Sequence, residues 1–243
     1  MKFNIKMIRS AAVTAFVAAC STAFASGPKH PADQEGWYGT LAIGQVLKPS
    51  ATTTRVDLSG GAVPITLIGT TTWGSGREGT LAIGRQSWSE DKDKPGEFSY
   101  RRIEGELYSG RVDRKAFNVG ALNQTLNDRL TATGLFINGL VRVYDTENTR
   151  WWVGAGIGWM QVKMPDANTP TTLCGCLGAA KGSGAALRVK GQVERLLSDK
   201  SAVFLELGYT SLPDASTAAG ALPRTTYEMP GLVNVSLGLR MKF

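Results

Sequence analysis

The residues of this chain that could do chemistry are few and widely separated. Histidine, the commonest general base near neutral pH, occurs once, as His30. Glu104 and Glu106 could act as an acid–base pair, but two carboxylates beside basic residues in a β-segment favour a structural ion network. The sequence therefore predicts no enzyme: no catalytic residue, no metal site and no cofactor.

Cys174 and Cys176 form the most unusual local feature, with only Gly175 between them. Two thiols without a neighbouring histidine are a poor zinc site. In an oxidising compartment they favour a disulfide that staples a loop, within this chain or to another one. A ring closed by so short a segment is strained and relatively reducible, so a redox or metal role is the alternative.

The N-terminus has the three parts of a secretory signal peptide. Residues 2–9 include three basic residues, residues 11–19 are apolar, and Ala23-Phe24-Ala25 is a small-x-small cleavage site. We expect residues 1–25 to be removed by cleavage after Ala25. The alternative is lipidation at Cys20, which follows Val17-Ala18-Ala19.

Loss of the signal lowers the formal net charge from +7 to +4, without a clustered basic run. This charge predicts no nucleic-acid partner and is compatible with anionic lipid headgroups. Residues 26–35, which include two prolines and lack apolar periodicity, form a polar lead. The remaining residues, 36–243, are expected to form one domain.

That domain repeats one pattern, in which segments of about ten residues alternate between apolar and polar positions. The clearest segments are Leu187–Leu197 and Val233–Phe243. Long connections alternate with short turns, as in a barrel threaded through a membrane. The predicted outer loops are Leu47–Gly76, Ala116–Asp128, Pro165–Ser183 and Pro213–Gly231, and the short turns are Ser89–Gly96, Thr146–Thr149 and Ser198–Lys200. The pattern predicts an all-β fold, a closed antiparallel up-and-down transmembrane barrel of about eight strands.

Two features favour a membrane barrel over a soluble one. Aromatic residues gather at the predicted periplasmic strand ends, as in an interfacial girdle: Trp37, Trp88, Tyr100, Tyr144, Trp151 and Phe243. The predicted polar faces carry charges of both signs, which suits a narrow lumen filled by side chains: Glu104, Glu106, Arg142, Arg188, Lys190, Glu194, Glu206 and Arg240. The alternative is a secreted β-protein with a solvated charged face.

Three segments resemble the opacity-type and outer-membrane-protein-A-type small barrels: Arg101–Leu107, Arg150–Trp159 and Val235–Phe243. The resemblance covers residues 36–243 and implies location in the cell outer membrane. It also implies that Phe243 completes the signal read by the barrel-assembly machinery. The chain departs from larger relatives because it stops at the eighth strand, so no peptidoglycan-binding domain is expected.

The expected function is a structural or surface-interaction role. The barrel would be held by outer-membrane lipid, and its exterior loops would contact an extracellular ligand. The alternative is a small channel or carrier for solutes through the charged lumen. Charges of both signs in near balance favour internal pairing over conduction.

Overall fold

The structure, a computed structural model, describes residues 35–58, 65–90, 98–120, 122–146, 148–166, 178–218 and 224–243. The predicted signal peptide, Cys20, His30 and the pair Cys174 and Cys176 lie outside these ranges. Among the described residues, no helix has the length and apolarity to cross a membrane. The strands are β1 Gly36–Val46, β2 Thr52–Asp57, β3 Thr66–Glu90, β4 Phe98–Val119, β5 Leu122–Asp145, β6 Thr149–Met164, β7 Ala180–Leu196, β8 Ser201–Thr210, β9 Ala215–Thr217, β10 Arg224–Tyr227 and β11 Leu232–Lys242.

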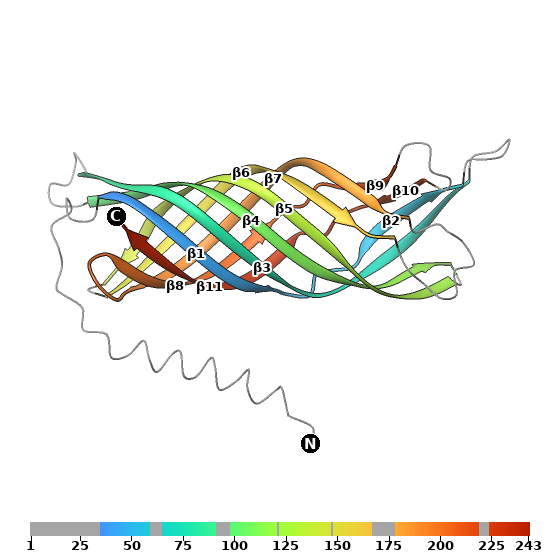
Figure 1. Cartoon of the computed structure of the whole chain (residues 1–243), viewed down its shortest axis with the longest axis horizontal. Helices are drawn as coiled ribbons and strands as arrows, with labels where there is room; N and C mark the ends of the chain where they lie inside the picture. Colours follow the sequence, from blue (N-terminus) through green and yellow to red (C-terminus); the bar gives the residue numbers. More distant parts are fainter. Residues whose placement is uncertain are drawn as a thin grey trace, which may run out of the picture.

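Within these ranges, eight antiparallel strands close into one barrel (Figure 1). The neighbour order is β1-β11-β8-β7-β6-β5-β4-β3, and β3 pairs back with β1. A path that starts at Leu41 and passes from each residue to its register partner through β3, β4, β5 and β6 ends at Ala185 on β7. The path in the opposite direction, through β11 and β8, ends at Arg195 on β7. This stagger of ten residues requires strands tilted by roughly 40°. The predicted eight-stranded barrel is confirmed.

At one end of the barrel, β2, β10 and β9 replace β1, β11 and β8 in the wall (Figure 1). β2 pairs with β3, β9 pairs with β7, and β10 joins β2 to β9, so the barrel continues as a second closed ring. Each interruption contains a proline, Pro49, Pro213 or Pro230, which has no N–H to donate to a sheet. We call this the outer end, and the end that holds the C-terminus the inner end.

A belt of exposed apolar side chains surrounds the middle of the barrel. The inward neighbours of these residues are mostly polar or small, as Arg188 and Lys190 are next to the outward Leu187 and Val189. Contiguous exposed apolar surface of this kind is the lipid-facing band of a transmembrane barrel. The predicted faces of the two C-terminal segments are confirmed. Members of the belt are Leu41, Ile43, Leu81, Ile83, Ile103, Leu107, Leu135, Ile137, Val153, Ile157, Leu187, Val189, Leu205, Leu207, Val235 and Leu239.

The strands reverse their polarity towards the outer end. On β5, Ile137 faces outward and Asn138 inward near the middle, whereas Arg129 faces outward and Leu130 inward further out. β3 has 25 residues and spans about 60 Å at the usual rise and tilt, which exceeds an apolar band of about 25 Å. The outer end therefore projects beyond the band with the polarity of a soluble protein.

All four predicted outer loops overlap strands, and these boundaries are corrected; Pro165–Ser183 overlaps the first four residues of β7. Ala116–Asp128 is the tip of the β4–β5 hairpin, which turns at Gly120, a residue with a φ of 55°. Leu47–Gly76 contains β2 and the first part of β3, and Pro213–Gly231 contains β9 and β10. The alternation was missed because these strands are rich in Thr and Asn and have no lipid-facing apolar side.

The aromatic residues at the inner end divide between two environments. Trp37, Tyr144, Trp151 and Phe243 are exposed there, as an interfacial girdle requires. Tyr100 was expected among them, but it is 5% exposed and faces the interior, so its assignment to the girdle was wrong. Its position shares the inward parity of the even-numbered residues on β4, such as Glu104 and Glu106. Trp88, also predicted there, packs partly buried against Tyr100.

Candidate functional site

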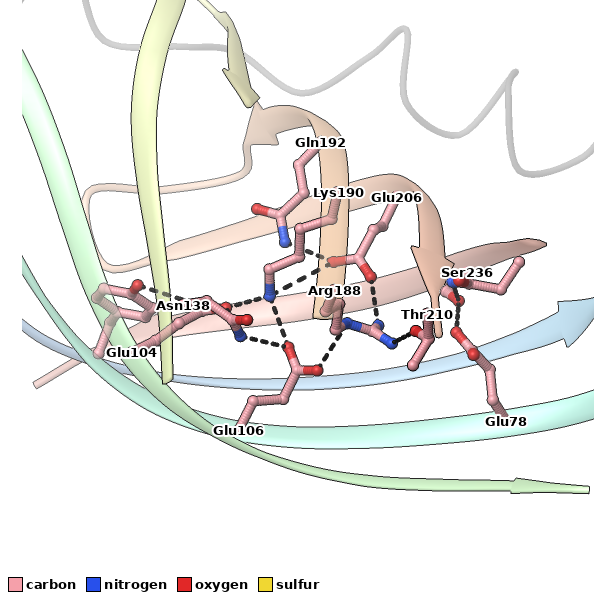
Figure 2. Close-up of polar contacts among 12 residues, drawn as sticks. Glu78, Glu104, Glu106, Asn138, Arg188, Lys190, Gln192, Glu206, Thr210 and Ser236 are labelled. Carbon is pink, nitrogen blue, oxygen red and sulfur yellow. Dashed lines mark hydrogen bonds and ion pairs between the residues drawn. The ribbon is translucent and has the colours of Figure 1, made fainter. Parts of the chain in front are cut away.

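Lys190 lies at the centre of an ion network in the middle of the barrel interior (Figure 2). It comes from β7, and it meets carboxylates from β4 and β8 that point at it across the lumen. Its Nζ donates to Glu104 Oε1 and, at 2.6 Å, to Glu106 Oε2, and it lies 3.9 Å from Glu206 Oε2. One buried ammonium thus holds three carboxylates together.

Arg188, two residues along the same face of β7, bonds to the same acidic group. Its Nε lies 2.9 Å from Glu106 Oε1, its Nη2 donates to Glu206 Oε1 at 2.9 Å, and its Nη1 donates to Thr210 Oγ1 at 2.8 Å. The guanidinium also lies 5.0 Å from the ring centroid of Tyr108. Paired in this way, Arg188 offsets the desolvation of two glutamates.

Neutral side chains complete the bonding of these carboxylates. Asn138 Nδ2 donates to Glu104 at 3.3 Å and to Glu106 at 3.2 Å. The Tyr38 hydroxyl donates to Glu104 at 3.0 Å, and Gln192 Nε2 donates to Glu206 at 2.7 Å. These donors come from β1, β5 and β7, so the bonds join several walls of the barrel.

Glu78 belongs to the polar interior on the side of β3. It accepts a hydrogen bond from Ser236 Oγ on β11 at 2.6 Å (Figure 2). Glu78 was not among the predicted site residues. Its inward parity with Thr80 and Ala82 on β3 was the signal that could have placed it in the lumen.

A second cluster surrounds Glu194, nearer the inner end. Arg102 Nη2 donates to it at 2.6 Å, and Arg240 Nε donates to it at 2.8 Å. Arg102 also donates to Gln86 at 2.9 Å and lies 3.6 Å from the ring centroid of Trp152. Arg102 was not among the predicted site residues, although it shares the inward parity of Glu104 on β4.

The structure brings seven of the eight predicted lumen charges into these two clusters and places Arg142 elsewhere. Arg142 lies at the inner mouth, where its guanidinium pairs with Asp145 at 2.9 Å and stacks 3.2 Å from the ring centroid of Tyr100. With Arg102 in its place, the clusters hold four carboxylates and four cations. At membrane depth the described interior is nearly neutral overall.

Above the clusters, the interior of the outer end is an apolar core. Trp73, Phe136, Leu130, Met160 and Val162 are fully buried in it. Its charged pair is Arg114 and Asp128, joined through Arg114 Nε and Asp128 Oδ1 at 2.7 Å and through a second bond between Nη2 and Oδ2.

Tyr227 caps this pair, with its ring centroid 5.5 Å from the Arg114 guanidinium. Burial raises the pKa of the Tyr227 phenol, so the side chain stays neutral beside the ion pair. A neutral aromatic ring there adds a cation–π contact without a further buried charge.

The remaining predicted residues lie apart from the clusters. Phe243 is 72% exposed at the inner end, where its N–H donates to the Trp37 carbonyl at 3.1 Å. Its role as an assembly signal stays a prediction. Cys174 and Cys176, with their predicted disulfide, lie outside the described residues.

The chemistry of this interior is ion pairing. Each carboxylate of the two clusters bonds to a cation, and the bonds run from β4 to β7 across the lumen. Within the described ranges, no group of three or more His, Cys, Asp or Glu residues could hold a metal ion. Fold and interior together define a small transmembrane barrel whose middle is bridged by ion pairs.

Comparisons with known proteins support this class. No protein-family model matches the chain, and no curated protein matches it. Among solved structures, the outer membrane protein OprG from Pseudomonas aeruginosa is similar over 86% of this chain and 97% of its own, with 11% sequence identity and a TM-score of 0.53. At this identity, the likeness shows the fold, that of a small outer-membrane β-barrel.

Two further solved structures align over similar lengths. Neisserial surface protein A aligns with 86% of this chain and 100% of its own, at 11% identity and a TM-score of 0.44. The attachment invasion locus protein Ail of Yersinia pestis aligns with 85% of this chain and 99% of its own, at 12% identity and a TM-score of 0.35.

Proposed function

We propose that this protein is an integral outer-membrane barrel with a structural or surface-interaction role, which it performs through its projecting outer end. The observation that carries the proposal is the reversal of polarity along single strands. Ile137 and Arg129 lie on the outward face of the same strand, one in an apolar belt and the other in a polar surface. The belt suits lipid and the outer end suits water.

The interior supports an anchoring role. Cross-lumen bonds such as Lys190 with Glu104 and Arg102 with Glu194 join opposite parts of the wall at membrane depth. An apolar core closes the outer end above them. A barrel held together in this way is a rigid support for the segments that it carries outside the membrane.

Cysteine labelling of intact cells tests the proposal. In a chain whose own cysteines are replaced by serine, Ile68→Cys at the outer end should react with a membrane-impermeant maleimide. Lys200→Cys, in the exposed β7–β8 turn at the inner end, should react only after the cells are permeabilised. Heat-modifiable gel mobility of both variants should show a folded barrel.

The opposite labelling pattern would reverse the orientation. Labelling of both sites only in a soluble periplasmic fraction would contradict the membrane assignment itself. The two variants control for each other, because both positions are exposed and each reports on one end.

The second candidate function is a small channel or carrier for solutes. It is favoured by the charged interior at membrane depth, where Lys190 and Arg188 face three glutamates. Transport by this route would require these ion pairs to separate and admit water. The near balance of charge and the density of bonds rank this function second.

A further inference from the structure

A groove of about 580 Å³ lies on the outward face of the barrel, between the belt and the outer end. Its volume is within the roughly 300–1,000 Å³ of small-ligand sites. It follows a bulge in β3, where the register with β4 shifts between Thr72 and Gly76. At Gly76, a Cβ atom would lie 2.0 Å from the Arg111 carbonyl oxygen, so the close approach of the strands requires glycine.

The charged side chains of the groove are mostly arginines. Arg77 on β3 and Arg111 on β4 are direct register partners, and Arg129 on β5 lies next to them. The carboxylate of the groove, Asp113, is 3.3 Å from Arg129 and 3.1 Å from Lys115. Neither the Arg77 nor the Arg111 guanidinium forms an ion pair or hydrogen bond with any residue that the structure describes.

Like charges directly opposite on one sheet face are destabilising unless an anion lies between them. The row of basic residues continues around the barrel wall. From Arg111, the register partners run through Thr131 on β5 to Lys163 on β6 and Lys181 on β7. Both lysines are exposed, and neither ammonium has a described ion-pair partner. The arrangement is the complement of a ligand that carries several negative charges.

The depth of the two arginines points to a membrane headgroup. In register, Arg77 corresponds to Lys163 on β6. Because the strands are staggered, the position on β6 at the same height as Arg77 lies about four residues nearer the inner end than Lys163. That position is Trp159. Trp159 is exposed at the outer edge of the belt, where interfacial tryptophans lie. Arg77 and Arg111 are therefore at headgroup level, and the lysines lie further out.

We propose that this groove is a binding site for the phosphate groups of an anionic glycolipid in the outer leaflet, with Arg77 and Arg111 as the phosphate ligands. Arginine binds phosphate oxygens through two parallel N–H donors, and two adjacent guanidinium groups can hold one phosphate. Arg129, Lys163 and Lys181 would contact further anionic groups above the first phosphate. The inference rests on the proposed function, since it requires the outer end to face the outer leaflet.

The test is a binding titration of the folded full-length protein in micelles of an uncharged detergent. The probes are a bis-phosphorylated glucosamine glycolipid, the same glycolipid without its phosphates, and inorganic phosphate. The wild-type protein should bind the phosphorylated glycolipid. The double variant R77Q/R111Q should bind it about 30-fold more weakly, since each basic side chain near an anionic surface contributes a factor of about five. The dephosphorylated glycolipid should bind wild type as weakly as the phosphorylated one binds the double variant.

Arg101→Gln is the matched control. Arg101 is also an exposed outward arginine of β4, but it lies ten residues from Arg111, at the inner end. This variant should bind the phosphorylated glycolipid as the wild type does. An equal loss in R101Q, or no loss in R77Q/R111Q, would overturn the site. Equal binding of the dephosphorylated glycolipid, or of inorganic phosphate alone, would overturn the ligand.

Heat-modifiable mobility separates this inference from the proposed function. If every variant shows heat-modifiable mobility but the wild type does not bind the glycolipid, the membrane barrel is supported and the proposed binding site is wrong. If the wild type lacks it in detergent and in vesicles, the membrane barrel itself is wrong.

Discussion

The two halves of the barrel interior differ, although the same strands line both. Near the middle, buried carboxylates and cations such as Glu106 and Lys190 fill the lumen, while the outward face is apolar. At the outer end, Leu130 and Trp73 fill the interior and the outward face is mostly polar. The difference follows from the surroundings of the wall. Lipid requires an apolar outward face, which leaves the polar side chains to pair inside.

The comparison also shows how each half is stabilised. The middle depends on satisfied charges, each of which is costly when its partner is removed. The outer end depends on packing, as the core of a soluble protein does, and loses stability when volume is removed. Substitutions in the two halves should therefore differ in what restores stability.

The largest effect is expected in the middle of the barrel. Lys190→Met should destabilise the folded protein by about 3–5 kcal/mol, because it leaves three glutamates around an uncharged side chain. Addition of Glu106→Gln should recover part of the loss, because it removes one uncompensated charge. Urea titration in lipid vesicles, followed by gel mobility, measures both. Lys200→Met, in the exposed turn, is the control and should be neutral.

A network of little energetic importance would show itself as equal stability of Lys190→Met and Lys200→Met. In that case the ion pairs of the middle would be solvated, and the contrast between the two halves would disappear.

A somewhat smaller loss is expected at the outer end. Leu130→Ala should cost about 2–5 kcal/mol, because it opens a cavity in a fully buried core. Leu130→Met, which keeps most of the volume, should cost less than about 1.5 kcal/mol. Urea titration gives the stability, and limited proteolysis should locate the opening at the outer end. Equal effects of the two substitutions would argue against a packed core there.

The lipid-facing surface gives a third comparison, between two equally exposed isoleucines. Ile137, in the belt, is 66% exposed, and Ile68, on β3 near the outer end, is 68% exposed. Ile137→Arg should cost about 2–4 kcal/mol in vesicles, because it places a charge in hydrocarbon. Ile68→Arg should change stability by less than about 0.5 kcal/mol. If the two variants unfold at the same urea concentration, the boundary between lipid and water is misplaced.

Much of the middle of the barrel could be predicted from the sequence, because the outward positions there are strongly apolar and the inward positions are strongly polar. On β7, Leu187 and Val189 against Arg188 and Lys190 identify both faces without knowledge of the neighbours. Strict counting of parity along β4 would also have placed Arg102 and Tyr100 inside. Tyr100 was assigned to the girdle because aromatic residues at strand ends are typical of that girdle as well.

The outer end could not be predicted in the same way. Its strands have mostly polar outward residues, and its apolar inward residues have the composition of an ordinary core, so the sequence pattern predicts loops there. Pairs such as Arg114 with Asp128, and the alignment of Arg77 with Arg111, depend on register between strands. That register cannot be derived from a single sequence, because it depends on how the strands pair in the closed sheet.

A planar-bilayer recording of the wild-type protein tests most directly whether the interior is closed. From the cross-lumen bonds of Lys190 and Arg102 and the apolar core above them, we expect ions to have no continuous aqueous path. The expected result is insertion, shown by protease protection of the belt, with no steady conductance above that of the bare bilayer. A stable unitary conductance from the inserted protein would contradict a closed interior and would make the solute channel the better description.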